Sequence, residues 1–181
     1  MGRPHERAWI VRTRGATLGL LVLGCGCGAR SGLDVPVESG CMVGTATLQV
    51  PSTAPWFDTG IDVTAGNRLQ ITATGTVRYG GDAQQVTDAN GGTYYGKKFF
   101  TTAVLPSAVV VSLIGKIGGT TDIGSGTPVP EGTPGDGPGF VGTSYGETVP
   151  ESGRLFLGFN DQTQAFADNS GAFTVTITLI C

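Results

Sequence analysis

The 181-residue chain is poor in histidine, and its single one, His5, lies in an N-terminal segment that we expect to be removed on export. Without His5, the remaining chain has no Ser-His-Asp or Cys-His catalytic arrangement and no imidazole ligand for zinc. Charged residues are also few, at 14% of the chain. Removal of residues 1–24 takes away four of the eleven basic residues and one of the fourteen acidic ones, which leaves a formal balance of −6. This acidic remainder has no basic patch, which excludes nucleic acid as a partner.

A long apolar run is missing as well. The N-terminal apolar segment covers only residues 16–23, too short to span a bilayer, and four arginines precede it. A basic region followed by a short apolar region and a small residue is typical of a secretory signal peptide. We therefore expect residues 1–24 to be a signal peptide and the protein to be exported.

The end of this segment, residues 21–25 with the sequence LVLGC, resembles a bacterial lipobox. That resemblance implies that Cys25 is acylated and becomes the mature N-terminus. Gly26, in place of an aspartate, indicates the outer membrane or cell surface of a Gram-negative bacterium. The alternative is that Cys25 and Cys27 are ordinary signal-peptide residues lost on cleavage.

Residues 25–40 are rich in glycine and serine without apolar periodicity, which predicts a flexible tether. We expect one domain over residues 41–181, with a cysteine at each end. In an exported protein we expect Cys41 and Cys181 to form a disulfide. In the chain-entropy model this bridge would contribute about 4–5 kcal/mol to the free energy of unfolding. The alternatives are free thiols or a bridge between two molecules.

Helix signals are nearly absent, and alternating or continuous apolar runs predict strands. The chain has 31 glycines and ten prolines, and most lie between these runs, where they supply turns. Together they predict an all-β fold, an antiparallel β-sandwich or jelly roll. The expected strands are Thr45–Val50, Leu69–Tyr79, Val109–Ile114, Leu155–Phe159 and Phe173–Leu179.

Two stretches are irregular. Trp56 stands just before an acidic turn and a further strand, and we expect it to cap the core rather than to stack on a sugar. Residues 118–153 hold five of the ten prolines and predict a long loop that serves as a lid, an insertion or a partner surface.

A polar loop between the last two strands gathers several oxygen-bearing side chains. Carboxylate, amide and carbonyl oxygens are the ligands that calcium prefers. The same residue types are also common in ordinary turns, and the spacing does not fit an EF-hand. The loop side chains are those of Asn160, Asp161, Asp168, Asn169 and Ser170.

Four segments together resemble the PA-I-like galactophilic lectins of bacteria. They are residues 56–60, residues 73–80, residues 113–118 and residues 155–173. The resemblance implies a small jelly roll, similar to galactose-binding domains, in which one calcium ion bridges protein and sugar. It assigns the metal to the backbone carbonyls of Tyr79 and Ala165 and to the side chains of Asp161, Asp168 and Asn169.

The chain departs from this family in three ways. Ala165 replaces a threonine, Asp168 replaces an asparagine, and the segment that carries the family's sugar-contacting histidine has none. Asp168 raises the negative charge of the site and removes an amide donor to the sugar. The replacement sugar contacts that we consider are Asp88, Asn90, Tyr94, Tyr95 and Asp168.

The sequence thus predicts a lipid-anchored, calcium-dependent protein that binds galactoside-type carbohydrate and has no enzymatic activity. One alternative is a structural or adhesive sandwich in which calcium stiffens the loop and no sugar binds. Another is a glycan-processing enzyme that uses Asp161 and Asp168 as a carboxylate pair. We weigh the enzyme least, because turn geometry or metal accounts for both residues.

Overall fold

The structure is a computed structural model that describes residues 44–92 and 95–181. Within these residues the secondary structure is almost entirely β, with one short 3₁₀ helix, η1 (Phe166–Asp168). The strands are β1 (Gly44–Pro51), β2 (Phe57–Val63), β3 (Arg68–Thr74), β4 (Val77–Tyr79), β5 (Val86–Thr87), β6 (Leu113–Ile117), β7 (Thr127–Pro128), β8 (Ser144–Thr148), β9 (Gly153–Phe159), β10 (Asn169–Ser170) and β11 (Ala172–Ile180).

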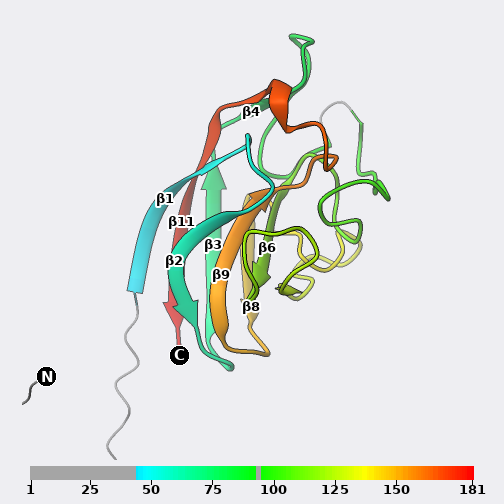
Figure 1. The fold of residues 1–181 in the computed structure, drawn as a ribbon. Helices are drawn as coiled ribbons and strands as arrows, with labels where there is room; N and C mark the ends of the chain where they lie inside the picture. The colour runs from blue at the N-terminus through cyan, green and yellow to red at the C-terminus, as the bar shows by residue number, and fades with distance from the viewer. Residues whose placement is uncertain (1–43, 93–94) are drawn as a thin grey trace, which may run out of the picture. The chain divides into compact units, whose positions relative to one another are not determined.

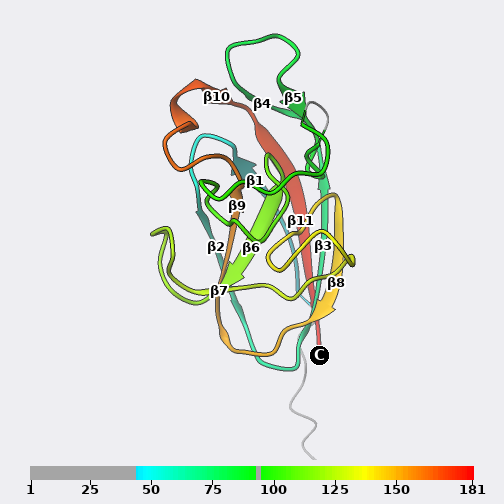
Figure 2. The same ribbon diagram turned by 90° about the vertical axis from the view of Figure 1, so that its right-hand side faces the viewer.

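The strands form two four-stranded sheets and one small sheet, and all of their pairings are antiparallel. One large sheet has the order β1-β11-β3-β8, and the other has the order β2-β9-β6-β7. The two lie side by side as layers in Figure 1. The small sheet, β10-β4-β5, lies at one end of them, at the top of Figure 2. The predicted antiparallel β-sandwich is therefore confirmed.

The main core fills the space between the two large sheets. On β3 the buried and exposed residues alternate strictly, and the same period of two continues on β11. Each buried side chain pairs in register with one of the neighbouring strand, for example Ile71 with Ile177. The outward-facing threonines of β1 and β11 bond one another across the strands, as in the pair Thr47–Thr176 at 3.1 Å. Apolar burial on one face and hydroxyl pairing on the other fix this sheet's register.

Strand β9 is buried on both faces. Leu155, Leu157 and Phe159 face the main core, whereas Phe156 belongs to a second apolar cluster outside the sheet. This second cluster explains why an apolar residue stands on the side of the strand that would otherwise be polar. Trp56, 5% exposed, belongs to the same cluster, which confirms its predicted place as a buried cap.

Three sequence predictions about regular structure are wrong. The strand expected over 69–79 ends with β3 at Thr74, and Gly75, with a φ of +93°, separates it from β4, which belongs to another sheet. The strand expected over 109–114 begins only at Leu113 and runs to Ile117. Before it, Val111 adopts a φ of +56°, and its N–H donates to the carbonyl of Asn160 at 2.8 Å, so the chain turns there instead of extending. The stretch 118–153 is also not one loop, because it contains β7 and the five residues of β8, which pair with β3.

Several predictions fall on residues outside the described ranges, namely the signal peptide, the tether, Cys25 and Cys41. The disulfide between Cys41 and Cys181 accordingly stays a prediction. The first residue of β1, Gly44, pairs with Leu179, two positions before Cys181. Over the described residues, the structure contains no helix with the length and apolar character needed to cross a membrane.

The close packing over β9 provides a first test. A Cβ built on Gly158 would collide with the carbonyl oxygen of Pro55 and would lie 2.9 Å from the Trp56 ring. We expect Gly158→Ala to lower the free energy of unfolding by about 1–3 kcal/mol, as overpacking does. Gly44→Ala, where nothing lies within 4 Å of the new Cβ, is the matched control and should change it by less than about 0.5 kcal/mol. Urea denaturation measures both, and equal stabilities for the two variants would contradict the packing described here.

Candidate functional site

The predicted metal residues meet at the end of the sandwich that carries the small sheet (Figure 2). The loop after β9 runs through η1 into β10, and β10 pairs with β4. In this pairing Asn169 lies directly opposite Tyr79, although 90 positions separate them in the sequence. The short β10–β4 ladder therefore brings both ends of the predicted ligand set together.

Asp161 is the most enclosed carboxylate of the loop, at 5% exposure. Its Oδ1 accepts the N–H of Gln162 at 2.7 Å, and its Oδ2 accepts the side-chain N–H of Asn169 at 3.0 Å. Burial raises the pKa of Asp161 above its ordinary value of 3.8, and the nearby charge of Asp168 raises it further, against these two hydrogen bonds. The folded chain thus holds a carboxylate whose negative charge is incompletely compensated.

Asn169 shows the complementary feature. Its Nδ2 donates to Asp161 and, at 3.1 Å, to the carbonyl oxygen of Ser52. Its Oδ1 is buried and has no hydrogen-bond partner. A buried acceptor without a partner costs about 1–3 kcal/mol, so native proteins rarely keep one without a reason.

The other predicted ligands surround this pair. Ala165 immediately precedes η1, and its N–H donates to the carbonyl of Gln162 at 2.9 Å, which closes a tight turn. Asp168 is the last residue of η1 and is exposed to solvent. Tyr79 ends β4, the strand against which η1 packs. The loop is thus a turn, as its composition suggests, and the turn brings Ala165 and Asp168 close to the strand that carries Tyr79.

Asn160 belongs to the predicted polar loop but faces away from the other residues. Its Nδ2 lies within 3.1 Å of three carbonyl oxygens, and its Oδ1 accepts the N–H of Leu105 at 2.8 Å. These carbonyls are those of Leu105, Ala108 and Val109. Asn160 therefore folds the segment before β6 onto the end of β9. Sequence reasoning could not separate this role from that of its neighbour Asp161.

Ser52 was missed entirely by sequence reasoning. It comes directly after β1, is fully buried, and orients Asn169 through its carbonyl oxygen. Its N–H and its Oγ both point to the carbonyl of Gly171, at 3.1 and 3.2 Å. Only the tertiary pairing of β1 with β11 reveals the contact, because 117 positions separate Ser52 from Asn169.

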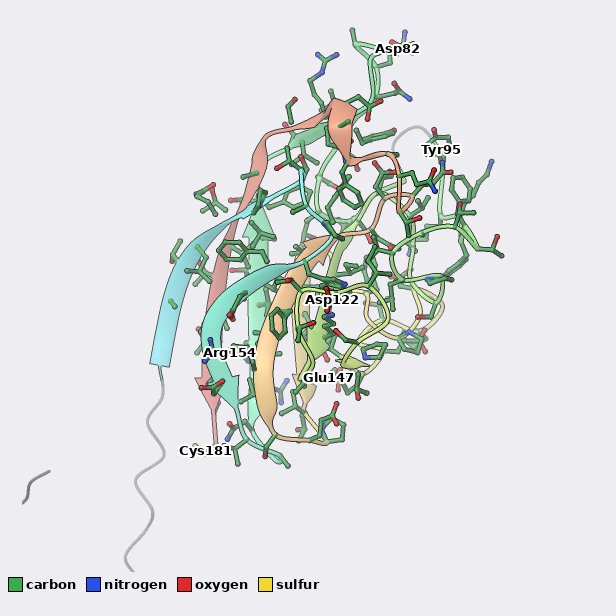
Figure 3. All side chains as sticks on the ribbon, in the orientation of Figure 1. Asp82, Tyr95, Asp122, Glu147, Arg154 and Cys181 are labelled. Carbon is green, nitrogen blue, oxygen red and sulfur yellow. The ribbon has the colours of Figure 1, made fainter. Side chains whose placement is uncertain are left out.

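The residues considered as sugar contacts are spread more widely. The ring of Tyr95 lies 5.9 Å from the ring of Tyr79, one of the predicted metal residues; Figure 3 marks the position of Tyr95. Asn90 uses its Oδ1 to accept the backbone N–H and the hydroxyl of Thr143, at 2.9 and 3.0 Å. Asp88 is exposed, and its Oδ1 accepts the N–H of Asn90 at 2.9 Å. Tyr94 lies outside the described residues.

A small cavity of about 200 Å³ opens on the same loop. Its walls carry hydroxyl and amide groups and no charge, and a hydrogen bond from the N–H of Thr163 to the carbonyl of Thr102, at 3.0 Å, holds its two sides together. The lining residues are Thr102, Gln162, Thr163 and Gln164. Sequence reasoning could not find this cavity, because Thr102 comes from a distant segment.

The donor set fits a hard cation in its chemistry. All of the predicted donors are oxygen atoms, and calcium takes six to eight of them from carboxylates, amides and carbonyls. Only two carboxylates take part, Asp161 and Asp168. Across residues 44–92 and 95–181, no three His, Cys, Asp or Glu side chains come together in a way that could hold a metal. A metal at this loop would therefore depend on carbonyl and amide oxygens, among them the unpartnered Oδ1 of Asn169.

No protein-family model matches the chain, and no curated protein does. Among solved structures the chain is similar to one described as "EclA N-terminal domain; PllA-like lectin". The two share 23% sequence identity with a TM-score of 0.48, and the match covers 74% of this chain and 95% of that one.

The raised pKa of Asp161 predicts how the stability of the metal-free protein depends on pH. The folded state holds the Asp161 proton more tightly than the unfolded state, so stability falls as the pH rises from 3.8 through the raised pKa. Asp168→Asn removes a repelling charge and should lower the pKa of Asp161. We expect this variant to lose less stability over that range than the wild type, in urea denaturation with a chelator present. Identical pH profiles would show that the two carboxylates do not interact.

Proposed function

We propose that this chain is a calcium-dependent carbohydrate-binding protein of the lectin type, held at the membrane by an N-terminal lipid. The observation that carries the proposal is the pair formed by Asp161 and Asn169. The buried carboxylate of Asp161, whose pKa is raised, accepts the amide N–H of Asn169 at 3.0 Å, and the Oδ1 of the same amide is buried without a partner. A cation next to both would compensate the charge of the first and give the second a partner.

In this proposal Asp161, Asp168 and Asn169 give side-chain oxygens, and Tyr79 and Ala165 give backbone carbonyls. Five protein donors leave one to three of calcium's usual positions open. Bound calcium would supply contacts for two vicinal hydroxyls of a sugar at those positions. The protein's part is to hold the oxygens in place, through Ser52, Gln162 and the β10–β4 ladder, before the metal arrives.

The surroundings suit a neutral, hydroxyl-rich ligand. The uncharged cavity beside Gln162 is smaller than the roughly 300–1,000 Å³ of pockets for drug-sized molecules, and its size suits about one sugar ring. Its amide and hydroxyl groups both donate and accept hydrogen bonds, as sugar hydroxyls do. Tyr95, whose ring also packs on Phe100 at 5.4 Å, offers an aromatic face near the loop. A galactoside is the sugar class that the family resemblance favours.

A second candidate function is a structural or adhesive sandwich in which calcium stiffens the loop and no sugar binds. The observation that favours it is the use of Asn90. The acceptor of this side chain is already taken by Thr143, and Asp88 in turn supports Asn90. Two of the considered sugar contacts therefore already serve the protein's own loops.

Calcium-dependent stability separates the metal site from an ordinary turn. We expect the melting temperature to rise with calcium, since a ligand that binds only the native state adds about 2.7 kcal/mol at a hundredfold excess over Kd. Asp161→Ala should abolish the shift, whereas Asp82→Ala, an exposed aspartate of the β4–β5 turn, should keep it (Figure 3). A glycan array with and without chelator then distinguishes the two functions, because only a lectin gives calcium-dependent spots. Absence of any shift at millimolar calcium would remove the metal and the lectin proposal together.

The lipid anchor is a separate part of the proposal. The lipobox-like end of the signal segment supports it, and each buried methylene of an acyl chain adds about 0.8 kcal/mol to membrane affinity. We expect the mature protein to carry acyl chains on Cys25, visible as added mass on the N-terminal peptide. Cys25→Ser should lose that mass and release the protein from the membrane fraction. An unchanged mass in this variant would argue for ordinary signal cleavage.

A further inference from the structure

A cleft of about 270 Å³ lies on the outer face of the β2-β9-β6-β7 sheet. Its lining is mostly apolar, with Trp56 on one side and the segment 104–106 on another. The turn 124–126 and Pro128 close it. In Figure 3 the label Asp122 marks the loop beside this cleft, away from Tyr95 and the metal loop, and Figures 1 and 2 both show this loop apart from η1 and β10.

Lys116 reaches this cleft from β6, a strand that is buried along its whole length. Its ammonium group donates to the carbonyls of Asp122 and Ser125, at 2.9 and 2.8 Å, and to the hydroxyl of Ser125 at 3.1 Å. It also lies 4.4 Å from the centre of the Trp56 ring. The residue is only 2% exposed.

No described carboxylate lies within 4 Å of this ammonium group. Its hydrogen-bond partners are neutral oxygens. The hydrogen bonds of the ammonium group are therefore made, but its charge is not neutralised. Burial lowers the pKa of Lys116, and the more distant charge of Asp122 opposes the shift only in part. Buried charges in proteins are normally paired. Because the charge of Lys116 is not, the cleft is electropositive.

Trp56 adds a second polar group whose bonding is incomplete. Its indole N–H is buried and has no acceptor in the described structure. The ring carrying this N–H is the one against which Lys116 packs, so an unused donor and an uncompensated positive charge lie close together. A donor next to a cation in an apolar wall selects for an anionic acceptor.

We propose that this cleft binds a small organic anion, a carboxylate carried on a compact apolar body. The carboxylate lies beside the Trp56 ring and is attracted by Lys116, while the apolar body packs on Leu105, Pro106 and Pro128. The volume, just under the usual range for drug-sized ligands, limits the body to about one ring. The cleft shares no residue with the metal loop, so the inference does not depend on the proposed function.

Tryptophan fluorescence tests the proposal directly. The chain has two tryptophans, Trp9 and Trp56, so the full chain with Trp9→Phe reports on the cleft alone. With benzoate as the probe, we expect a saturable change in emission, and with benzamide, the neutral molecule of the same shape, at least tenfold weaker binding. Lys116→Met should weaken benzoate binding at least tenfold, whereas Lys98→Met, at an exposed lysine outside the cleft, should leave it unchanged.

Lys116 also bonds the loop at residues 122–125, so its substitution disturbs that loop as well as the cleft. A second variant, which leaves Lys116 in place, separates loss of binding from loss of structure. Pro106→Glu places a negative charge at the exposed rim without touching Lys116 and should also weaken benzoate binding at least tenfold. A non-saturable response to benzoate, an equal response to benzamide, or full binding by Pro106→Glu would overturn the proposal. Equal saturable binding of both probes would identify a neutral apolar cleft instead.

Discussion

Burial of β9 on both faces is the constraint on which the rest of the structure depends. On its inner side, Leu155, Leu157 and Phe159 complete the core between the sheets. On its outer side, Trp56 and the loops over it pack against Phe156 and against the bare backbone of Gly158. A strand fixed on both faces cannot shift by one residue without moving apolar groups into the wrong layer. The position of everything attached to its end is thereby set.

The two residues directly after β9 depend on that rigidity. Asn160 and Asp161 are consecutive, so in extended backbone their side chains leave on opposite sides. Asn160 turns inward and holds the carbonyls of the segment before β6, which brings Val111 into its unusual positive φ. Asp161 turns to Asn169 and the small sheet. The same pair of residues therefore folds one loop and orients Asn169 in another. The strain at Val111 is tolerated because Asn160 holds the turn on both sides.

The sequence supported the fold well because its signal is local. Alternation on β3 and β11 can be read from neighbouring residues, and so can the oxygen-rich character of residues 160–170. Interactions between distant segments could not be read in this way. The continuous apolar run at 109–114 suits a buried strand by composition, yet Asn160 and the tertiary contacts of Val111 bend its first half. Ser52 and Thr102 reach the candidate site only through pairings that span more than 50 residues, and a single sequence does not carry that information.

The metal loop and the cleft share one property: each holds a buried charge that is not compensated, and the two charges have opposite signs. Asp161 is a buried negative charge beside an unpartnered acceptor, and Lys116 is a buried positive charge beside an unpartnered donor. In each case hydrogen bonds to neutral groups fix the geometry and leave the charge uncompensated. Stability alone would favour an apolar residue at either position, since an unpaired buried charge is costly. Ligands of opposite charge, the cation that we propose at one end and the anion that we propose on one face, would compensate the two charges.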